Sequence, residues 1–130
     1  MRLLLDTHVV LWWFGGDKRI SKSLRELLRT HDHDIVISAA TFWEIAIKQA
    51  RGHVTLELPE LEAAMKQQQF VELPVRAFHT MRLRFLPFHH RDPFDRLLIA
   101  QSIAEGRQLV TSDRWILAYD GVPGLRLLNA

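Results

Sequence analysis

The chain has 130 residues, enough for one domain around one hydrophobic core. It contains no cysteine, which excludes disulfide frameworks and thiolate zinc sites and favours a reducing compartment. The formal net charge of +2 is compatible with nucleic acid binding and equally with an ordinary solvated surface. The apolar run at residues 9–14 is too short to span a membrane, and Asp6 interrupts the N-terminal apolar stretch that a signal peptide would need. We therefore expect a cytoplasmic protein with a single domain, residues 1–130.

Short apolar runs alternate with segments of helical period in the first half of the chain. The leucine run at 3–5 predicts a buried strand, and residues 7–15 predict an apolar helix that ends at a glycine pair. Ser21 can cap a helix that carries Leu24 and Leu28 on one face. The other elements predicted here are a β-branched strand at 35–37, a helix at 41–51 and a helix at 59–69.

The second half continues the alternation of strands and helices. Its predicted elements are a strand at 70–73, helices at 75–84 and 93–105, a strand at 109–111, a short helix at 114–119 and an edge strand at 125–128. Strands that alternate with helices predict an α/β fold, in which helices cover both faces of a parallel sheet. Ligands of such open sheets bind beyond the carboxyl ends of the strands, where the strand order reverses.

Two carboxylates are predicted to meet at that edge of the sheet. Asp6 directly follows the first predicted strand, and Asp113 lies two residues beyond Thr111, where the fourth strand ends. If these strands are neighbours, both carboxylates lie in one crevice, where a hard cation such as Mg²⁺ or Mn²⁺ relieves their repulsion. Each acid could instead cap the helix that follows it.

Two further acids lie in the first turns of predicted helices. Because helix N-termini in this kind of fold point to the same edge, Glu44 and Asp95 are predicted to join the first two acids in one metal site. Each has a structural alternative: Thr41 and Glu44 match a capping box, and Asp95 could complement the helix dipole. Asp92 precedes Pro93 and has the pattern of an N-cap.

Several polar side chains lie near these acids along the chain. Hydroxyl groups that could orient a metal or phosphate, or merely cap helices, follow strands at Thr7, Ser38, Thr111 and Ser112. His89 and His90 could ligate a metal or contact phosphate, or belong to a solvated loop. The sequence has no glycine-rich phosphate loop, nucleophile elbow or zinc-protease motif.

Four segments of the sequence resemble the motifs of the PIN-domain nucleases. They are residues 3–7 (LLLDT), 38–48 around Glu44, 91–101 (RDPFDRLLIAQ) and 109–113 (LVTSD). The third segment is the most specific, and it resembles the VapC-type toxins of bacterial toxin–antitoxin pairs. The motifs follow the family's order and span almost the whole chain.

The resemblance implies a three-layer α/β/α domain with a central parallel sheet of four to five strands. It also implies an endoribonuclease that uses one or two Mg²⁺ or Mn²⁺ ions to hydrolyse RNA phosphodiester bonds. The positions that match the family's catalytic and metal-binding acids are Asp6, Glu44, Asp95 and Asp113. Asp92 is an extra acid near them, and His8 stands where a small or amide residue is common. The basic residues expected to hold the RNA backbone are Arg91, Arg96 and Arg114.

The resemblance also implies protein partners. Family members are neutralised by a small VapB-like antitoxin, which lays a helix or tail along an apolar groove, and they form homodimers. The groove candidates lie on the two N-terminal helices: Trp12, Trp13, Leu24 and Leu28. The alternative is that these side chains, like Trp43, only fill the core.

Two other functional classes compete with the ribonuclease. A metal-dependent phosphotransfer or phosphatase protein of flavodoxin-like topology also places acids at strand ends. It usually needs a strand-end lysine or an Asp-x-Asp pair, which the sequence lacks near Asp6 and Asp113. A non-catalytic PIN-like binding module is disfavoured by the four acids, because clustered carboxylates without a use cost stability.

Overall fold

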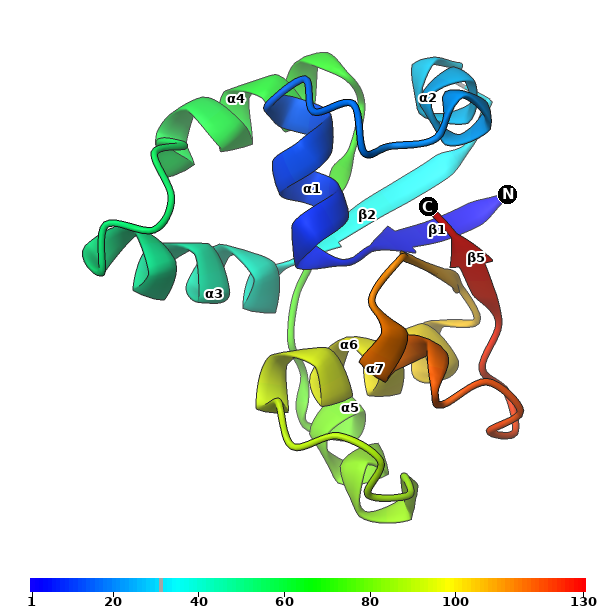
Figure 1. Cartoon of the computed structure of the whole chain (residues 1–130). Coiled ribbons are helices and arrows are strands. Elements are labelled where there is room, and N and C mark those ends of the chain that lie inside the picture. The colour runs from blue at the N-terminus through cyan, green and yellow to red at the C-terminus, as the bar shows by residue number, and fades with distance from the viewer. Residues whose placement is uncertain (31) are drawn as a thin grey trace.

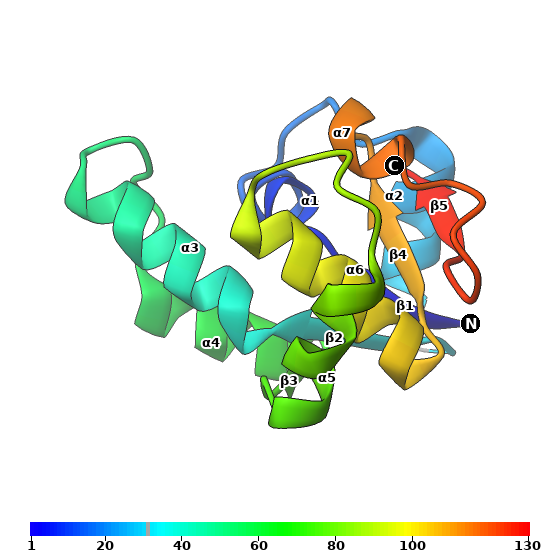
Figure 2. The same ribbon diagram turned by 90° about the horizontal axis from the view of Figure 1, so that it is seen from below.

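The fold is built on one parallel sheet with helices on both faces (Figures 1 and 2). The computed structural model describes residues 1–30 and 32–130. The strands are β1 (Arg2–Leu5), β2 (Asp34–Ser38), β3 (Val71–Leu73), β4 (Gln108–Thr111) and β5 (Leu127–Asn129). Every pairing between neighbouring strands is parallel. The predicted α/β class, with a central parallel sheet of four to five strands, is confirmed.

The strand order is β3-β2-β1-β4-β5, so β1 lies at the centre of the sheet. Leu5 pairs with Ile37 of β2 on one side and with Val110 of β4 on the other. The chain first builds the sheet outward from β1 to β3 and then returns to add β4, so the order reverses between β1 and β4. This 3-2-1-4-5 order differs from the flavodoxin-like order 2-1-3-4-5, so the flavodoxin-like alternative is wrong.

The helices cover the sheet in two groups. In Figure 1, α1 (Thr7–Phe14), α2 (Lys22–Arg29) and α4 (Leu58–Gln67) lie above the sheet. Below it lie α5 (Ala77–Met81), α6 (Pro93–Glu105) and α7 (Arg114–Leu117), and α3 (Ala39–Ala50) extends from the end of β2. Leu3 and Leu5 pack in the core of the first group, whereas Leu4 packs against α6. Both faces of β1 are therefore buried, which explains its uninterrupted apolar run.

Local signals account for most helix boundaries. Ser21 accepts the N–H of Leu24 as the N-cap of α2, and Gly106 ends α6 in the left-handed region, with φ of 63°. Two boundaries differ from the prediction. Helix α3 begins at Ala39 rather than at residue 41, because Ser38 is the N-cap. The helix predicted at 75–84 is α5 followed by a 3₁₀ helix, η1 (Arg82–Phe85).

The late start of α5 has a cause in its own side chains. The ring Nδ1 of buried His79 accepts the N–H of Arg76, which fixes the first turn at Ala77. The edge strand β5 also lies later than predicted, at Leu127–Asn129. None of the helices in the described ranges is long and apolar enough to cross a membrane.

Candidate metal centre

Asp6 lies where β1 ends, and it is the N-cap of α1. Its Oδ1 accepts the N–H of Val9 at 2.9 Å, and its Oδ2 accepts a hydrogen bond from the hydroxyl of Thr111. Only 2% of the residue is exposed. Burial raises the pKa of Asp6, although the two hydrogen bonds act in the opposite direction. The N-cap role proposed from the sequence therefore coexists with a buried carboxylate at the sheet edge.

Asp113 holds the matching position beyond β4. Its own N–H donates to Oγ1 of Thr111 at 3.0 Å, and its Oδ1 accepts the N–H of Trp115 at 2.8 Å, which makes it the N-cap of α7. The hydroxyl of Thr111 thus joins the two strand-end acids. The negative charge of Asp113 contributes to the raised pKa of Asp6, as expected for two carboxylates in one crevice.

Glu44 reaches the site from the second turn of α3, not from the first. The hydroxyl of Thr7 donates to its Oε1 at 2.7 Å, and Nζ of Lys48 lies 3.2 Å from its Oε2. Thr41 is a residue of the first turn of α3 and is buried, and its hydroxyl lies 3.3 Å from that of Thr7. The capping-box alternative is therefore wrong, because Ser38 rather than Thr41 caps α3. The side chain of Glu44 turns toward the residue that follows Asp6.

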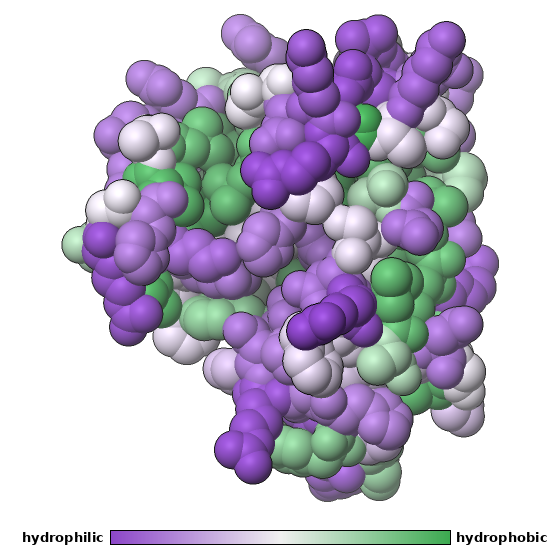
Figure 3. All heavy atoms as spheres, in the orientation of Figure 1, coloured by the Kyte–Doolittle hydropathy of each residue, from purple (hydrophilic) through white to green (hydrophobic). Residues whose placement is uncertain are grey.

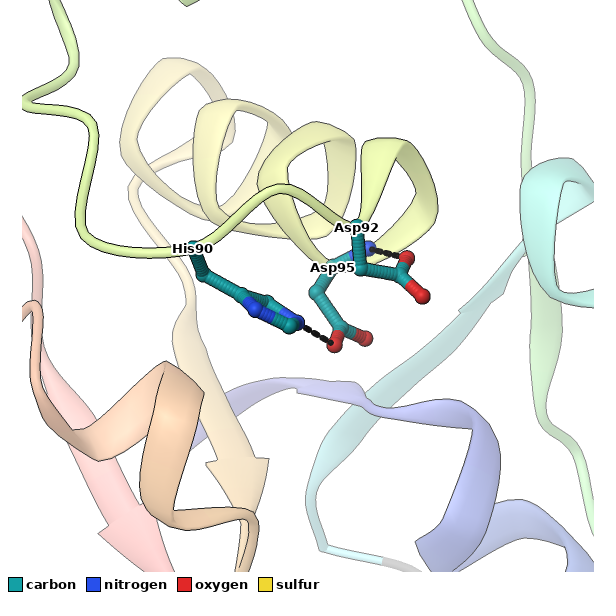
Figure 4. A group of neighbouring side chains, drawn as sticks. All are labelled: His90, Asp92 and Asp95. Carbon is teal, nitrogen blue, oxygen red and sulfur yellow. Dashed lines mark hydrogen bonds and ion pairs between the residues drawn. The ribbon is translucent and has the colours of Figure 1, made fainter.

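Asp95 lies in the first turn of α6, beside a second acid and a histidine (Figure 4). Oδ1 of Asp92 accepts the N–H of Asp95 at 3.0 Å, so Asp92 is the predicted N-cap. Nε2 of His90 lies 2.9 Å from Oδ2 of Asp95. These three side chains could share a cation, since one ligand atom of each lies within 4.8 Å of the others.

The electrostatics connect Asp95 to the other acids. Burial raises the pKa of Asp95 to about 7, and the negative charges of Asp92, Asp113 and Glu44 add to this effect. The hydrogen bond from His90 lowers the pKa but does not cancel the rise. Carboxylate oxygens that repel one another, with an imidazole at the side, are a donor set that suits a divalent cation.

Comparison with known proteins identifies the family of this domain. The model of the PIN domain matches residues 3–122. The chain belongs to the PIN-domain family. Ribonuclease VapC22 of Mycobacterium tuberculosis (strain ATCC 25618 / H37Rv) is 28% identical over 114 residues, which cover 86% of this chain and 87% of that protein. The resemblance that the sequence motifs indicate is confirmed.

Solved structures with the same fold include two complexes with DNA. VapBC2 from Rickettsia felis, bound to a DNA fragment from their promoter, matches with a TM-score of 0.72 at 18% identity, over 99% of this chain and 98% of that one. DNA-bound VapBC from Salmonella typhimurium matches with a TM-score of 0.69 at 15% identity, over the same shares of the two chains. This likeness shows the PIN fold.

The three arginines predicted to hold RNA differ in their exposure to solvent. Arg91 and Arg114 are exposed near the acids. Arg96 is only 8% exposed, and its guanidinium donates to the carbonyls of Pro87 and Leu83 and to the Tyr119 hydroxyl. The prediction for Arg96 is wrong, because these bonds hold the guanidinium inside the fold, where it braces the segment before α6.

Only two of the four predicted hydroxyl groups contact the acids. Thr7 and Thr111 hold the carboxylates of Glu44 and Asp6, whereas buried Ser38 only caps α3. Ser112 is exposed, and within residues 1–30 and 32–130 its hydroxyl makes no hydrogen bond. Sequence reasoning left His90 open; its contact with Asp95 depends on the loop before α6, for which the sequence gives no periodic signal.

The predicted groove residues also divide. Trp12 and Trp13 are partly exposed, and Nε1 of Trp13 donates to Oε1 of Gln68. The prediction that Leu24 and Leu28 line the groove is wrong, because both side chains are buried in the core beneath α2. Trp12 borders a hollow of about 530 Å³ that includes Lys48 and the segment at residues 53–56. Figure 3 shows apolar side chains gathered at the surface between α1, α3 and α4, with hydrophilic side chains around them.

Proposed function

We propose that this PIN domain, a single domain of residues 1–130, is a divalent-metal-dependent endoribonuclease and the toxin of a toxin–antitoxin pair that acts in the cytoplasm. The proposal rests on one observation above all: Asp6 and Asp113 follow the neighbouring strands β1 and β4 where the strand order reverses, and the Thr111 hydroxyl donates to Asp6 and accepts the N–H of Asp113. Burial raises the pKa of Asp95 to about 7, and the charges of Asp113 and Glu44 add to this rise, as is common at functional sites. The similarity to Ribonuclease VapC22 supports RNA as the substrate.

The side chains fit one or two Mg²⁺ or Mn²⁺ ions. The residues that would hold them are Asp6, Glu44, Asp95 and Asp113. Their donors are oxygen atoms; burial raises the pKa of Asp6 and of Asp95, and the charge of Asp113 adds to both rises. A cation bound there supplies positive charge that stabilises the phosphate during hydrolysis and favours ionisation of a water molecule.

The protein's own residues keep this site in position. Thr111 and the N–H of Val9 bond the two oxygens of Asp6, and Thr7 bonds Oε1 of Glu44, which fixes the orientation of both carboxylates. Nζ of Lys48 pairs with Glu44 and offsets part of the repulsion among the acids, and the hydrogen bond from His90 favours the ionised form of Asp95. Arg91 and Arg114, both exposed beside the acids, would contact the RNA backbone and set affinity rather than sequence choice.

The test of nuclease function uses the purified chain, freed of any bound partner, with transfer, ribosomal and messenger RNA. Cleavage with Mg²⁺ or Mn²⁺ should stop when a chelator is added. Asp6→Asn should reduce cleavage about 100-fold or more, as expected when a group that organises transition-state charge is lost. Glu62→Gln, an exposed carboxylate on α4, is the matched control and should cut like the parent. Full activity of Asp6→Asn with an unchanged fold would refute the metal site.

We further propose that a VapB-like antitoxin covers the hollow beside Trp12 and that the chain forms a homodimer. The hollow combines apolar Leu11 and Leu56 with the charged side chains of Arg19 and Lys48, as a groove for an amphipathic helix would. The product of a short gene next to this one should bind the chain and stop cleavage. Trp12→Ala should weaken that binding at least 10-fold, in line with an aromatic hot spot. Sedimentation of the purified chain tests the dimer.

A further inference from the structure

A second hollow, of about 500 Å³, lies beside the acids. It is lined by aromatic and basic side chains: Phe88, His89, His90, Arg91 and Trp115. Its volume is within the range of roughly 300–1,000 Å³ common for small-molecule sites. Phe88 is 73% exposed and Trp115 is 47% exposed, which is unusual for large aromatic side chains with no role in the core. The function proposed above does not use these rings.

The hollow is joined directly to two of the four acids. The imidazole of His90 stacks on the indole of Trp115, with ring centroids 5.6 Å apart and planes 7° apart. The same imidazole bonds Asp95 through Nε2, and the backbone N–H of Trp115 donates to Asp113. A group that lies on Trp115 is therefore next to the place where the acids would act on a phosphate.

The aromatic surface is held in place before any ligand binds. The Arg96 guanidinium lies 4.3 Å from the ring centre of Phe88 and donates to the Tyr119 hydroxyl. That hydroxyl accepts the N–H of His90 at 3.0 Å, so Arg96 supports Phe88 by a cation–π contact and His90 through the hydroxyl of Tyr119. Such preorganisation lowers the entropy lost on binding, because the rings need not be ordered by the ligand.

Charge and shape identify the ligand class. Planar aromatic faces bind nucleobases by stacking, and the exposed cations Arg91 and Arg114 can hold the phosphates on either side of a base. The guanidinium of Arg114 already lies 5.1 Å from the Trp115 ring centre. A neutral apolar peptide would leave these arginines without counter-charge. The combination therefore fits nucleic acid better than a protein segment.

We propose that this hollow is a nucleobase subsite, in which an unpaired base next to the scissile phosphate stacks on Trp115 or Phe88. The inference rests on the proposed ribonuclease function and specifies its substrate class. A base in a duplex is stacked between its neighbours, so only single-stranded or looped RNA can offer a base to the hollow. The site therefore selects unpaired RNA at the point of cutting.

The test measures equilibrium binding in the Asp6→Asn background with Mg²⁺, where cleavage does not deplete the RNA. A fluorescein-labelled single-stranded RNA decamer should bind more tightly than the same sequence in a duplex. Trp115→Ala should weaken binding of the single strand about 5- to 150-fold, which corresponds to about 1–3 kcal/mol for one stacked base. Trp115→Phe should keep most of the affinity. Trp12→Ala alters the separate hollow beside α1 and should bind like the parent.

Removing the base instead of the indole avoids any doubt about folding. A series of decamers carries one abasic nucleotide each, at successive positions. The parent should bind one member of the series more weakly than the rest, and Trp115→Ala should bind that member no more weakly than it binds the intact decamer. Equal affinity of Trp115→Ala and parent, or no preference for the single strand, would overturn the subsite. A Trp115→Ala change that weakens only antitoxin binding would also overturn it and assign the hollow to a protein. If the parent neither binds nor cuts RNA, the proposed ribonuclease function is refuted as well. If the parent cuts RNA and Trp115→Ala binds RNA equally well, only the subsite is refuted.

Discussion

The raised pKa of Asp95 predicts that the metal-free protein loses stability as the pH rises. The carboxyl has an ordinary value of 3.8 in the unfolded chain and about 7 in the folded one, because it is buried among other acids. A group whose pKa is raised on folding stabilises the fold below its unfolded pKa. That contribution is lost as the pH rises through the folded pKa. The loss should therefore fall between pH 4 and pH 8.

The expected size of the effect follows from the shift. A rise of roughly three units corresponds to about 4 kcal/mol at 1.36 kcal/mol per unit. The Asp95 side chain is 15% exposed, at the mouth of an open site, so solvent screening reduces this figure, to roughly 2 kcal/mol. For a domain of this size, that corresponds to a fall of about 8 °C in Tm. Asp95→Asn cannot ionise and should not show this part of the loss.

The assay is urea or thermal unfolding of the parent and Asp95→Asn at pH 4.0, 6.0 and 8.0 with a chelator. The difference in unfolding free energy between the two proteins should shift by about 2 kcal/mol in favour of the variant as the pH rises. Addition of Mg²⁺ at pH 8.0 should restore the parent and leave the variant unchanged. Glu62→Gln controls for the loss of one exposed carboxylate. Parallel pH profiles for the parent and Asp95→Asn would refute the reasoning.

Four further substitutions test separate parts of the fold and the site. Thr111→Val keeps the side-chain shape but removes the bonds to Asp6 and Asp113; urea unfolding should show a loss of about 1–3 kcal/mol, with slower cleavage, and an unchanged rate would contradict a role in orienting Asp6. Arg96→Met should destabilise the fold by about 3 kcal/mol, because it leaves buried acceptors without a donor. Arg91→Ala should leave the unfolding free energy unchanged and should reduce by about 1 the slope of the logarithm of RNA affinity against the logarithm of salt concentration. Leu24→Ala should cost about 2–5 kcal/mol of stability through a core cavity; a stable variant with weak antitoxin binding would return this residue to the groove.

The sequence predicts the strands and the positions of the acids because both depend on local signals. The leucine run of β1 marks a strand buried on both faces, and an acid directly after it must lie at the sheet edge. The neighbouring positions of β1 and β4 were only a condition of the metal-site prediction, and the strand order satisfies it. The prediction that Glu44 lies in the first turn of its helix was wrong. Ser38 and Thr41 are both acceptable N-caps, and only tertiary packing decides which of them begins α3.

Side-chain exposure was the least predictable property. An arginine after an N-cap usually faces solvent, but Arg96 meets Tyr119 and the carbonyl of Leu83, and neither partner is near it in sequence. Trp43 was expected in the core, yet it is 61% exposed, with the edge of Phe94 against its ring. Composition gives the number of apolar and charged side chains, whereas distant partners decide which of them are buried.

The central pairing of β1 with β4 also bears on how a cell makes this protein. Asp6 and the hydroxyl that holds it belong to residues 105 positions apart, and Asp113 follows later still. A chain emerging from the ribosome therefore carries its first acid long before the groups that complete the site. Translation products that stop before β4 have neither Thr111 nor Asp113 and cannot assemble the four acids. The order of synthesis thus delays completion of the proposed metal site until nearly all of the fold has been made.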